Sequence, residues 1–253
     1  MIREFYCAGN WKMNKNPEQA EQFAQALKAA APTATRSQLV VFPPALVAYQ
    51  VAAVLNDTGI GWGAQNCYFT SKGAFTGENS PQVLAEMGAR FCLVGHSERR
   101  QIFGELDEQV ALKVEGAQKH GLTPILCVGE TLDDRRWNRT QEVILRQLRM
   151  ALHSTDVSKP IWIAYEPVWA IGTGEVATPS QVEEVHESLR KALSEWNTSA
   201  GESTPILYGG SVKVDNARTL ASLKNVNGFL IGGASLDVQE FIKIHQTSIE
   251  ARQ

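Results

Sequence analysis

The stretch that decides the fold runs from an apolar strand through one carboxylate into a glycine-rich segment: Ala164-Tyr165-Glu166-Pro167-Val168-Trp169-Ala170-Ile171-Gly172-Thr173-Gly174. Residues Ile161 to Tyr165 are continuously apolar, as in a parallel strand covered on both faces, so Glu166 lies at the strand's carboxyl end. Pro167 fixes its own φ and Trp169 is a large, rigid anchor, whereas the glycines let backbone amides approach a ligand. The stretch predicts a catalytic base with an attached lid or, alternatively, an ordinary connection to a helix that begins near Thr178.

Length and charge limit the classes of protein that the chain can represent. Its 253 residues, 43% of them hydrophobic, suffice for a full core, but length alone leaves one domain or two open. A net charge of −3 and a pI near 6.0 provide no broad cationic surface, so we expect neither nucleic acid nor a membrane as a partner.

The sequence shows no signal-peptide core and no membrane span, and we expect a cytoplasmic protein. The 4 cysteines stand singly among apolar residues, which indicates reduced, buried thiols.

Strand-like and helical patterns alternate along the whole chain. Short β-rich runs begin near Phe5, Gln38, Gly61, Arg90, Pro124, Ile161, Pro205 and Asn227, and a helical pattern follows each. Helix starts are marked by a capping residue and a proline at Asn16-Pro17, Ser80-Pro81 and Thr178-Pro179. No linker or change in composition divides the chain, which favours a single domain. Strict alternation leaves an eight-stranded parallel barrel or an open, doubly wound sheet.

The positions of polar residues separate these two architectures. Asn10 and Lys12 follow the first strand, His96 and Glu98 follow the fourth, and Glu166 follows the sixth. In a barrel the carboxyl ends of all strands share one mouth, whereas an open sheet would spread these strands along an edge. No Gly-x-Gly-x-x-Gly turn follows the first strand. The sequence therefore predicts an α/β barrel with the polar side chains at its mouth.

Two glycine turns lie at the carboxyl ends of the last two predicted strands. They are Tyr208-Gly209-Gly210-Ser211 and Leu230-Ile231-Gly232-Gly233-Ala234. Barrels form phosphate sites at this place, where a helix N-terminus and exposed peptide N–H groups meet an anion. One Gly-Gly pair is most often only a tight turn, but two pairs and the glycines of the lid together indicate a small phosphorylated ligand.

Five motifs resemble one family. They are Gly9-Asn10-Trp11-Lys12, Gly95-His96-Ser97-Glu98-Arg99-Arg100, the stretch from Tyr165 to Gly174, Tyr208-Gly209-Gly210-Ser211-Val212 and Gly232-Gly233. In this order and spacing they are similar to the triosephosphate isomerases, over essentially the whole chain. The resemblance implies a single (β/α)8 TIM barrel spanning residues 1–253. It also implies an isomerase of glycolysis and gluconeogenesis that interconverts dihydroxyacetone phosphate and D-glyceraldehyde 3-phosphate through an enediolate.

The resemblance further implies roles for individual residues. Glu166 would be the base that moves the proton, His96 would polarise the carbonyl, and Lys12 would supply positive charge. Asn10 would help to hold the substrate oxygens, and Glu98 would orient Lys12. These kinds of side chain suit the reaction, because a proton on the carbon next to a carbonyl is removed only if the developing oxyanion is stabilised. Backbone N–H groups would bind the phosphate at Gly172, Ser211, Gly232 and Gly233. No metal or organic cofactor is implied.

A flexible lid and a subunit contact follow from the same resemblance. The lid comprises Pro167, Val168, Trp169, Ala170, Ile171, Gly172, Thr173 and Gly174. The contact residues of a homodimer would be Met13, Phe75, Thr76 and Glu78. The segment from 64 to 78 carries Tyr68, Phe69 and Phe75, whose rings we expect to be exposed at this contact.

Two other functions are possible for such a barrel, and three residues of the chain differ from the family pattern. A Schiff-base aldolase on the same barrel would need a lysine within a strand, yet residues 161–165 and 205–208 contain none. A catalytically silent phosphate-binding barrel would lose Lys12, His96 or Glu166, and all three are present. The departures are Lys15, Leu106 and Glu175, none of them at a catalytic position. We expect them to affect the lid or the subunit contact, and the sequence does not decide which.

Overall fold

Eight parallel strands close into a barrel in the computed structural model, which describes residues 4–153, 155–156, 158–171 and 175–253. The strands are β1 (Tyr6–Asn10), β2 (Leu39–Phe42), β3 (Gly61–Ala64), β4 (Phe91–Val94), β5 (Thr123–Val128), β6 (Trp162–Tyr165), β7 (Ile206–Tyr208) and β8 (Gly228–Ile231). Each begins within about one residue of its predicted start. The first and last strands pair in register at Ala8 and Leu230, which closes the sheet and confirms the barrel.

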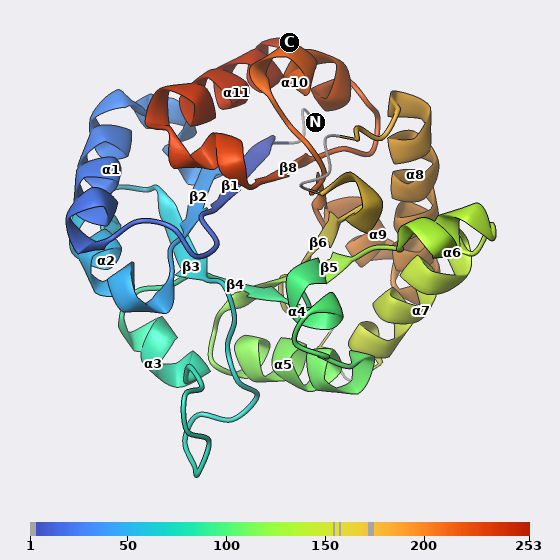
Figure 1. Ribbon diagram of the computed structural model, residues 1–253, viewed down its shortest axis with the longest axis horizontal. Helices are drawn as coiled ribbons and strands as arrows, with labels where there is room; N and C mark the ends of the chain where they lie inside the picture. Colours follow the sequence, from blue (N-terminus) through green and yellow to red (C-terminus); the bar gives the residue numbers. More distant parts are fainter. Residues whose placement is uncertain (1–3, 154, 157, 172–174) are drawn as a thin grey trace.

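Helices form an outer ring around the strands (Figure 1). They are α1 (Pro17–Ala30), η1 (Thr33–Gln38), η2 (Ala45–Val47), α2 (Ala48–Leu55), α3 (Pro81–Glu86), α4 (Ser97–Gln101), α5 (Asp107–Lys119), α6 (Leu132–Arg136), α7 (Thr140–Leu152), η3 (Val168–Ala170), α8 (Pro179–Trp196), α9 (Thr198–Ser203), α10 (Val214–Ala221), η4 (Gly233–Leu236) and α11 (Val238–Glu250). The caps predicted at Asn16, Ser80 and Thr178 are present, and each side chain accepts a hydrogen bond from the first turn. Local sequence therefore sets where these three helices begin.

The apolar residues divide into two layers because side chains alternate along each strand. One layer fills the barrel interior, with Ala8, Phe42 and Leu93 among its buried members. The larger layer lies between the barrel and the helices and includes residues such as Val41 and Val185. The strands are covered on both faces, and this explains why their sequences are continuous apolar runs. All 4 cysteines are buried free thiols, as expected.

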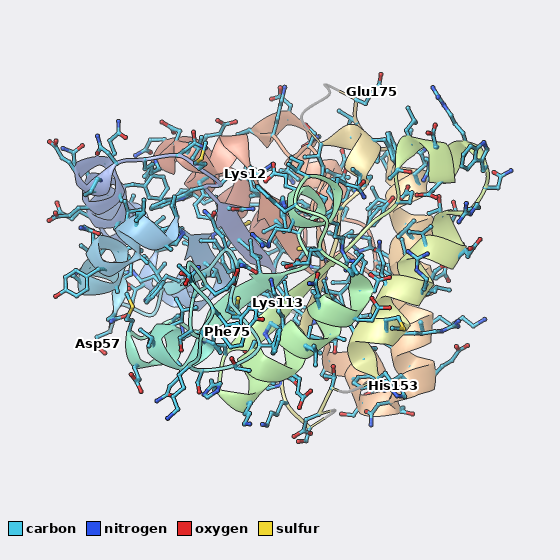
Figure 2. All side chains as sticks on the ribbon, turned by 60° about the horizontal axis from the view of Figure 1, so that its bottom comes forward. Lys12, Asp57, Phe75, Lys113, His153 and Glu175 are labelled. Carbon is cyan, nitrogen blue, oxygen red and sulfur yellow. The ribbon has the colours of Figure 1, made fainter. Side chains whose placement is uncertain are left out.

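The carboxyl ends of the strands gather at one face of the molecule. Lys12 lies toward this face in Figure 2, as does Glu175, whereas His153, just after α7, lies toward the opposite edge. The segment between β3 and α3 projects beyond the helix ring (Figure 1). Among the described helices, none combines the length and apolar character that a membrane span requires.

The aromatic rings of the projecting segment differ from expectation. Phe75 is 41% exposed, but Tyr68 and Phe69 are only partly exposed. The rings of Tyr68 and Phe69 stack with centroids 4.1 Å apart, and Phe75 packs 4.4 Å from Tyr68. The prediction of three exposed rings is therefore wrong for two of them, because the segment buries its own aromatic surface.

Candidate active site

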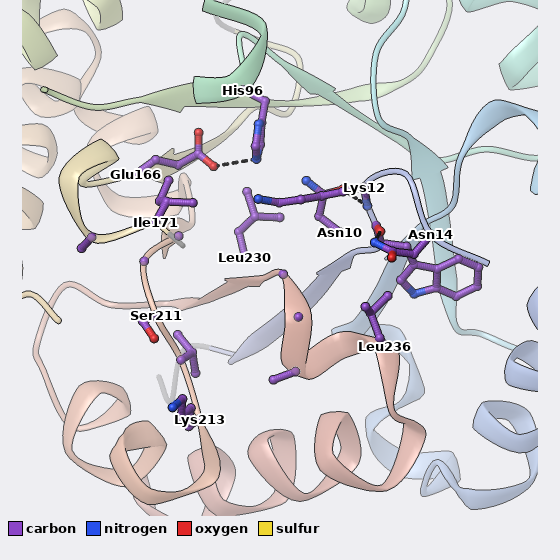
Figure 3. Close-up of a pocket in the computed structure, with 18 of the residues that line it drawn as sticks. Asn10, Lys12, Asn14, His96, Glu166, Ile171, Ser211, Lys213, Leu230 and Leu236 are labelled. Atoms are coloured by element: carbon purple, nitrogen blue, oxygen red, sulfur yellow. Dashed lines mark hydrogen bonds and ion pairs between the residues drawn. The ribbon is translucent and has the colours of Figure 1, made fainter. Parts of the chain in front are cut away.

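The predicted polar residues converge on one cavity of about 500 Å³ at the carboxyl ends of the strands. Asn10 ends β1, His96 follows β4 and Glu166 follows β6, so strands far apart in sequence supply neighbouring side chains. Figure 3 shows His96, Glu166 and Lys12 together on one side of the cavity, with Ser211 on the other. We call these two sides the catalytic wall (Asn10, Lys12, His96 and Glu166) and the phosphate wall (Ser211, Gly232 and Gly233).

Glu166 is buried and held by two donors. Its Oε1 lies 3.0 Å from Nε2 of His96, and its Oε2 accepts a 2.8 Å hydrogen bond from the backbone N–H of Ser97. Burial raises the pKa of Glu166, but the contacts with His96 and Ser97 outweigh burial and hold this pKa below its ordinary value. The residue is therefore a carboxylate, the form in which it accepts a proton.

His96 connects this carboxylate to the start of α4. Its Nδ1 accepts a 3.2 Å hydrogen bond from the backbone N–H of Glu98, so Nδ1 carries no proton and Nε2–H donates to Glu166. Burial lowers the pKa of His96, and the charge of Glu166 more than reverses that effect. A neutral imidazole satisfies both hydrogen bonds. The direct pairing of His96 with Glu166 was not foreseen from the sequence.

Lys12 is fixed at both its backbone and its ammonium group. Its φ is +51°, in the left-handed region, and its N–H donates to Oδ1 of Asn10 at 3.0 Å. Gln65 donates to the Lys12 carbonyl at 2.8 Å, and the Lys12 ammonium lies 2.7 Å from Oε1 of Glu98. Glu98 thus makes the contact with Lys12 that the sequence analysis expected. Gln65, from the segment after β3, is a supporting residue that sequence reasoning missed.

Two glycines leave room for Glu166. A Cβ at Gly129 would collide with the backbone carbonyl of Glu166, and one at Gly209 would lie 2.9 Å from its Cγ. Side chains at these positions would displace the carboxylate. The strands on both sides of β6 are therefore each followed by a glycine where the chain passes Glu166.

The first part of the predicted lid is attached to Glu130, just after β5. The Glu130 side chain is fully buried, and its Oε1 accepts hydrogen bonds from Nε1 of Trp169 at 2.9 Å and the hydroxyl of Tyr165 at 3.1 Å. The backbone N–H of Val168 donates to the Glu130 carbonyl at 3.1 Å. Residues 167–171 are thus tied to the barrel, and the lid residues Gly172, Thr173 and Gly174 lie outside the described part of the chain. Glu130 follows a strand, the same signal that singled out Glu166, but sequence reasoning did not assign it a role.

Small residues and backbone groups form the phosphate wall. Gly232 precedes η4, and its carbonyl accepts from both the N–H and the hydroxyl of Ser235, at 2.9 and 2.7 Å. The Ser211 carbonyl accepts a 3.0 Å hydrogen bond from Asn216, which fixes the turn after β7. Ile171, predicted as part of the lid, contributes to the apolar lining of the cavity. Four other lining residues were given no role in the prediction: Val212, Lys213, Leu230 and Glu240.

The predicted subunit-contact residues lie on an exposed face outside this cavity. Met13 is 96% exposed, and Phe75, Thr76 and Glu78 are exposed as well. A second hollow of about 600 Å³ lies beside the active site and is lined by Met13 and Glu78, and also by Glu98. This open hollow borders the residue that holds Lys12. In the described part of the chain, no three or more His, Cys, Asp or Glu side chains are grouped as metal ligands.

Comparison with known proteins places this arrangement in one family. Residues 5–248 match the family model described as "Triosephosphate isomerase". A triosephosphate isomerase of Bdellovibrio bacteriovorus is 50% identical over 237 residues, which cover 94% of this chain and 97% of the relative. One from Coxiella burnetii is 47% identical over 249 residues, 97% of this chain and 98% of the relative. One from Nitrosococcus oceani is 43% identical over 242 residues, 95% of this chain and 97% of the relative.

Proposed function

The chain belongs to the triosephosphate isomerase family and interconverts dihydroxyacetone phosphate and glyceraldehyde 3-phosphate, and on that premise we propose that Glu166 is the base. Its carboxylate takes a proton from C1 of dihydroxyacetone phosphate and returns a proton to C2 of the enediolate. The hydroxyl proton moves in the same sense, from O1 to O2, so the atoms balance. The observation that carries this proposal is the convergence of Glu166, His96 and Lys12 on one cavity.

His96 and Lys12 stabilise the negative charge that develops on the substrate oxygens. Nε2–H of His96 now donates to Glu166, and the same donor becomes available to a substrate oxygen once the carboxylate turns toward C1. Lys12 adds a positive charge, which Glu98 holds in place. Asn10 positions the Lys12 backbone and provides an amide beside the substrate oxygens. These groups are fixed before substrate binds, so little reorganisation accompanies the reaction.

The phosphate group occupies the opposite side of the cavity. Backbone N–H groups of Ser211, Gly232 and Gly233 bind it there, and Gly172 adds a further N–H when the lid closes. Residues Pro167 to Gly174 form the lid that excludes water from Glu166 and the enediolate. Trp169, bonded to Glu130, anchors the start of that lid.

Glu166→Asp tests the assignment of the base. The substitution withdraws the carboxylate by about one methylene group, and a misplacement of ~1 Å costs on the order of 10² in rate. We expect kcat to fall by this factor while KM changes much less. A folded Glu166→Asp enzyme with nearly normal kcat would exclude Glu166 as the base.

We also propose a homodimer in the cytoplasm. Met13, Phe75, Thr76 and Glu78 supply an exposed contact face, and the hollow beside Lys12 is open to receive a second subunit. Thr76→Arg combined with Phe75→Glu should give monomers of reduced activity by light scattering, because charge and bulk enter the contact. A wild-type enzyme that is monomeric and fully active at micromolar concentration would contradict the dimer. Cell fractionation tests the location.

A further inference from the structure

The segment between β1 and α1 holds a second lysine, Lys15, for which the mechanism has no use. Its φ is +74°, in the left-handed region where glycine is favoured. Its neighbours Asn14 and Asn16 are exposed, whereas Lys15 is partly buried. A residue with a Cβ keeps such a conformation only where surrounding contacts hold it.

The contacts of Lys15 join two loops of the barrel mouth. Its ammonium group donates a 2.8 Å hydrogen bond to the carbonyl of Leu236, the last residue of η4. The same group lies over the ring of Phe23 at 4.5 Å and over that of Trp11 at 5.3 Å. Partial burial lowers the pKa of Lys15, and the carboxylate of Asp237 opposes that shift. The Lys15 ammonium group thus lies at the C-terminal end of η4, where a cation stabilises the unpaired carbonyls of a helix.

Lys12 and Lys15 lie at opposite ends of the same turn. A Cβ built on Gly232, which precedes η4, would lie 3.6 Å from Cε of Lys12, so the Lys12 stem passes close to this glycine. Lys15 lines a neighbouring hollow and binds the carbonyl of Leu236 at the other end of η4. The two lysines leave one loop three positions apart and lie at the two ends of a four-residue turn. Movement of η4 relative to the loop would alter the position of both lysines relative to the turn.

We propose that Lys15 is a positioning residue that clamps η4 to the segment after β1 and so fixes Lys12 relative to the phosphate wall. The proposal rests on the phosphate site at Gly232 and Gly233 proposed above. The Lys15 ammonium lies at the C-terminal end of η4, and the substrate phosphate would lie at its N-terminal end. Both charges favour the same orientation of the turn's dipole. Lys15 therefore affects phosphate affinity without contacting the substrate.

Lys15→Met removes the ammonium donor and keeps the aliphatic stem. We expect the inhibition constant of inorganic phosphate to rise about 5- to 10-fold, with a similar loss of kcat/KM, because one charged hydrogen bond to η4 is lost. Lys15→Arg keeps a charged donor and should stay within about 2-fold of wild type. Lys28→Met, at an exposed position in α1, removes the same charge and should match wild type.

Lys15→Gly separates positioning from stability. Glycine relieves the left-handed backbone, so its unfolding temperature should equal or exceed that of Lys15→Met. Its phosphate affinity should nevertheless fall as much as that of Lys15→Met, since both lack the donor. Recovery of phosphate affinity in Lys15→Gly would show a purely structural role and overturn the clamp.

A test of the phosphate wall keeps the two proposals distinguishable. Gly233→Pro removes one proposed N–H donor and should weaken phosphate inhibition on its own. If Gly233→Pro weakens phosphate binding but Lys15→Met behaves like Lys28→Met, the clamp is wrong and the phosphate site stands. If Gly233→Pro leaves phosphate inhibition unchanged, the phosphate wall is wrong and the clamp is wrong with it.

Discussion

The two walls of the cavity are built in different ways. On the catalytic wall, the proposed groups are the side chains of Glu166, His96 and Lys12, each held by a partner such as Ser97 or Glu98. On the phosphate wall, the proposed groups are peptide N–H groups, and the residues are a serine and two glycines. One wall depends on which side chain is present, whereas the other depends on backbone conformation.

This difference governs how each wall responds to mutation. A side chain removed from the catalytic wall takes the reactive group with it. A side chain removed from the phosphate wall leaves the N–H group in place, so that wall is sensitive only to changes of the backbone, such as proline or a displaced η4. Catalysis and binding can therefore be impaired separately.

The largest contrast is expected between Lys12→Met and Ser211→Ala. Lys12→Met removes a charge from the enediolate and should lower kcat/KM by roughly 10²- to 10³-fold. Ser211→Ala keeps the backbone N–H and should change kcat/KM by no more than about 2- to 3-fold. Steady-state kinetics in both directions measures both values. Similar losses in the two variants would show that the walls do not differ as described.

Gly172→Pro tests a backbone donor of the lid, at a position outside the described residues. It removes an N–H and restricts the lid tip, so kcat should fall by roughly 10- to 100-fold while the barrel stays folded. An open lid exposes the enediolate, whose phosphate can be eliminated, so the fraction of methylglyoxal and inorganic phosphate per turnover should rise. Normal circular dichroism, rate and methylglyoxal yield together would identify the segment as a simple connection.

The pH profile of His96→Gln tests the pairing within the catalytic wall. The hydrogen bond from Nε2–H of His96 helps to hold the pKa of Glu166 down, whereas burial raises it, so removing the imidazole should move this pKa upward. Activity needs the carboxylate form of Glu166. As pH falls, kcat/KM of the variant should therefore begin to decrease at a higher pH than kcat/KM of wild type. Each profile is scaled to its own plateau, and the substrate phosphate titrates equally in both. An unshifted acid limb would mean that His96 does not set the charge of Glu166.

His186 lies outside both walls and should affect stability and not rate. It is fully buried behind β6, its Nδ1 lies 3.1 Å from the Asn225 carbonyl, and burial lowers its pKa from 6.5 to about 4. As pH falls, the unfolded chain binds a proton at His186 before the folded chain does. The free energy of unfolding should therefore drop by roughly 3 kcal/mol between pH 6.5 and 4. His186→Asn keeps a donor near Asn225 and should flatten this dependence in denaturant titrations. The exposed His153→Asn serves as the control, and equal slopes in the two variants would contradict the buried, neutral His186.

Sequence patterns predicted most of the catalytic wall and less of what supports it. Asn10, Lys12, His96 and Glu166 follow strands, and a parallel barrel brings the ends of its strands together. Apart from the pairing of Lys12 with Glu98, contacts between elements remote in sequence were not predicted, such as that of Gln65 with the Lys12 carbonyl. Tyr68 and Phe69 were wrongly expected to be exposed, because sequence shows that a ring is present but not what it packs against. The predicted lid tip, subunit contact and residue roles remain predictions.

The most direct test of the account is hydrogen exchange into substrate in deuterated water, comparing wild type with Glu166→Gln. Gln fills the same space but cannot take the proton, while the phosphate wall is left intact. We predict that wild type incorporates deuterium into both triose phosphates. Glu166→Gln should bind inorganic phosphate within about 3-fold of wild type yet exchange substrate hydrogen only at the uncatalysed rate. Deuterium incorporation by Glu166→Gln at a rate near that of wild type would contradict the central claim that Glu166 moves the proton.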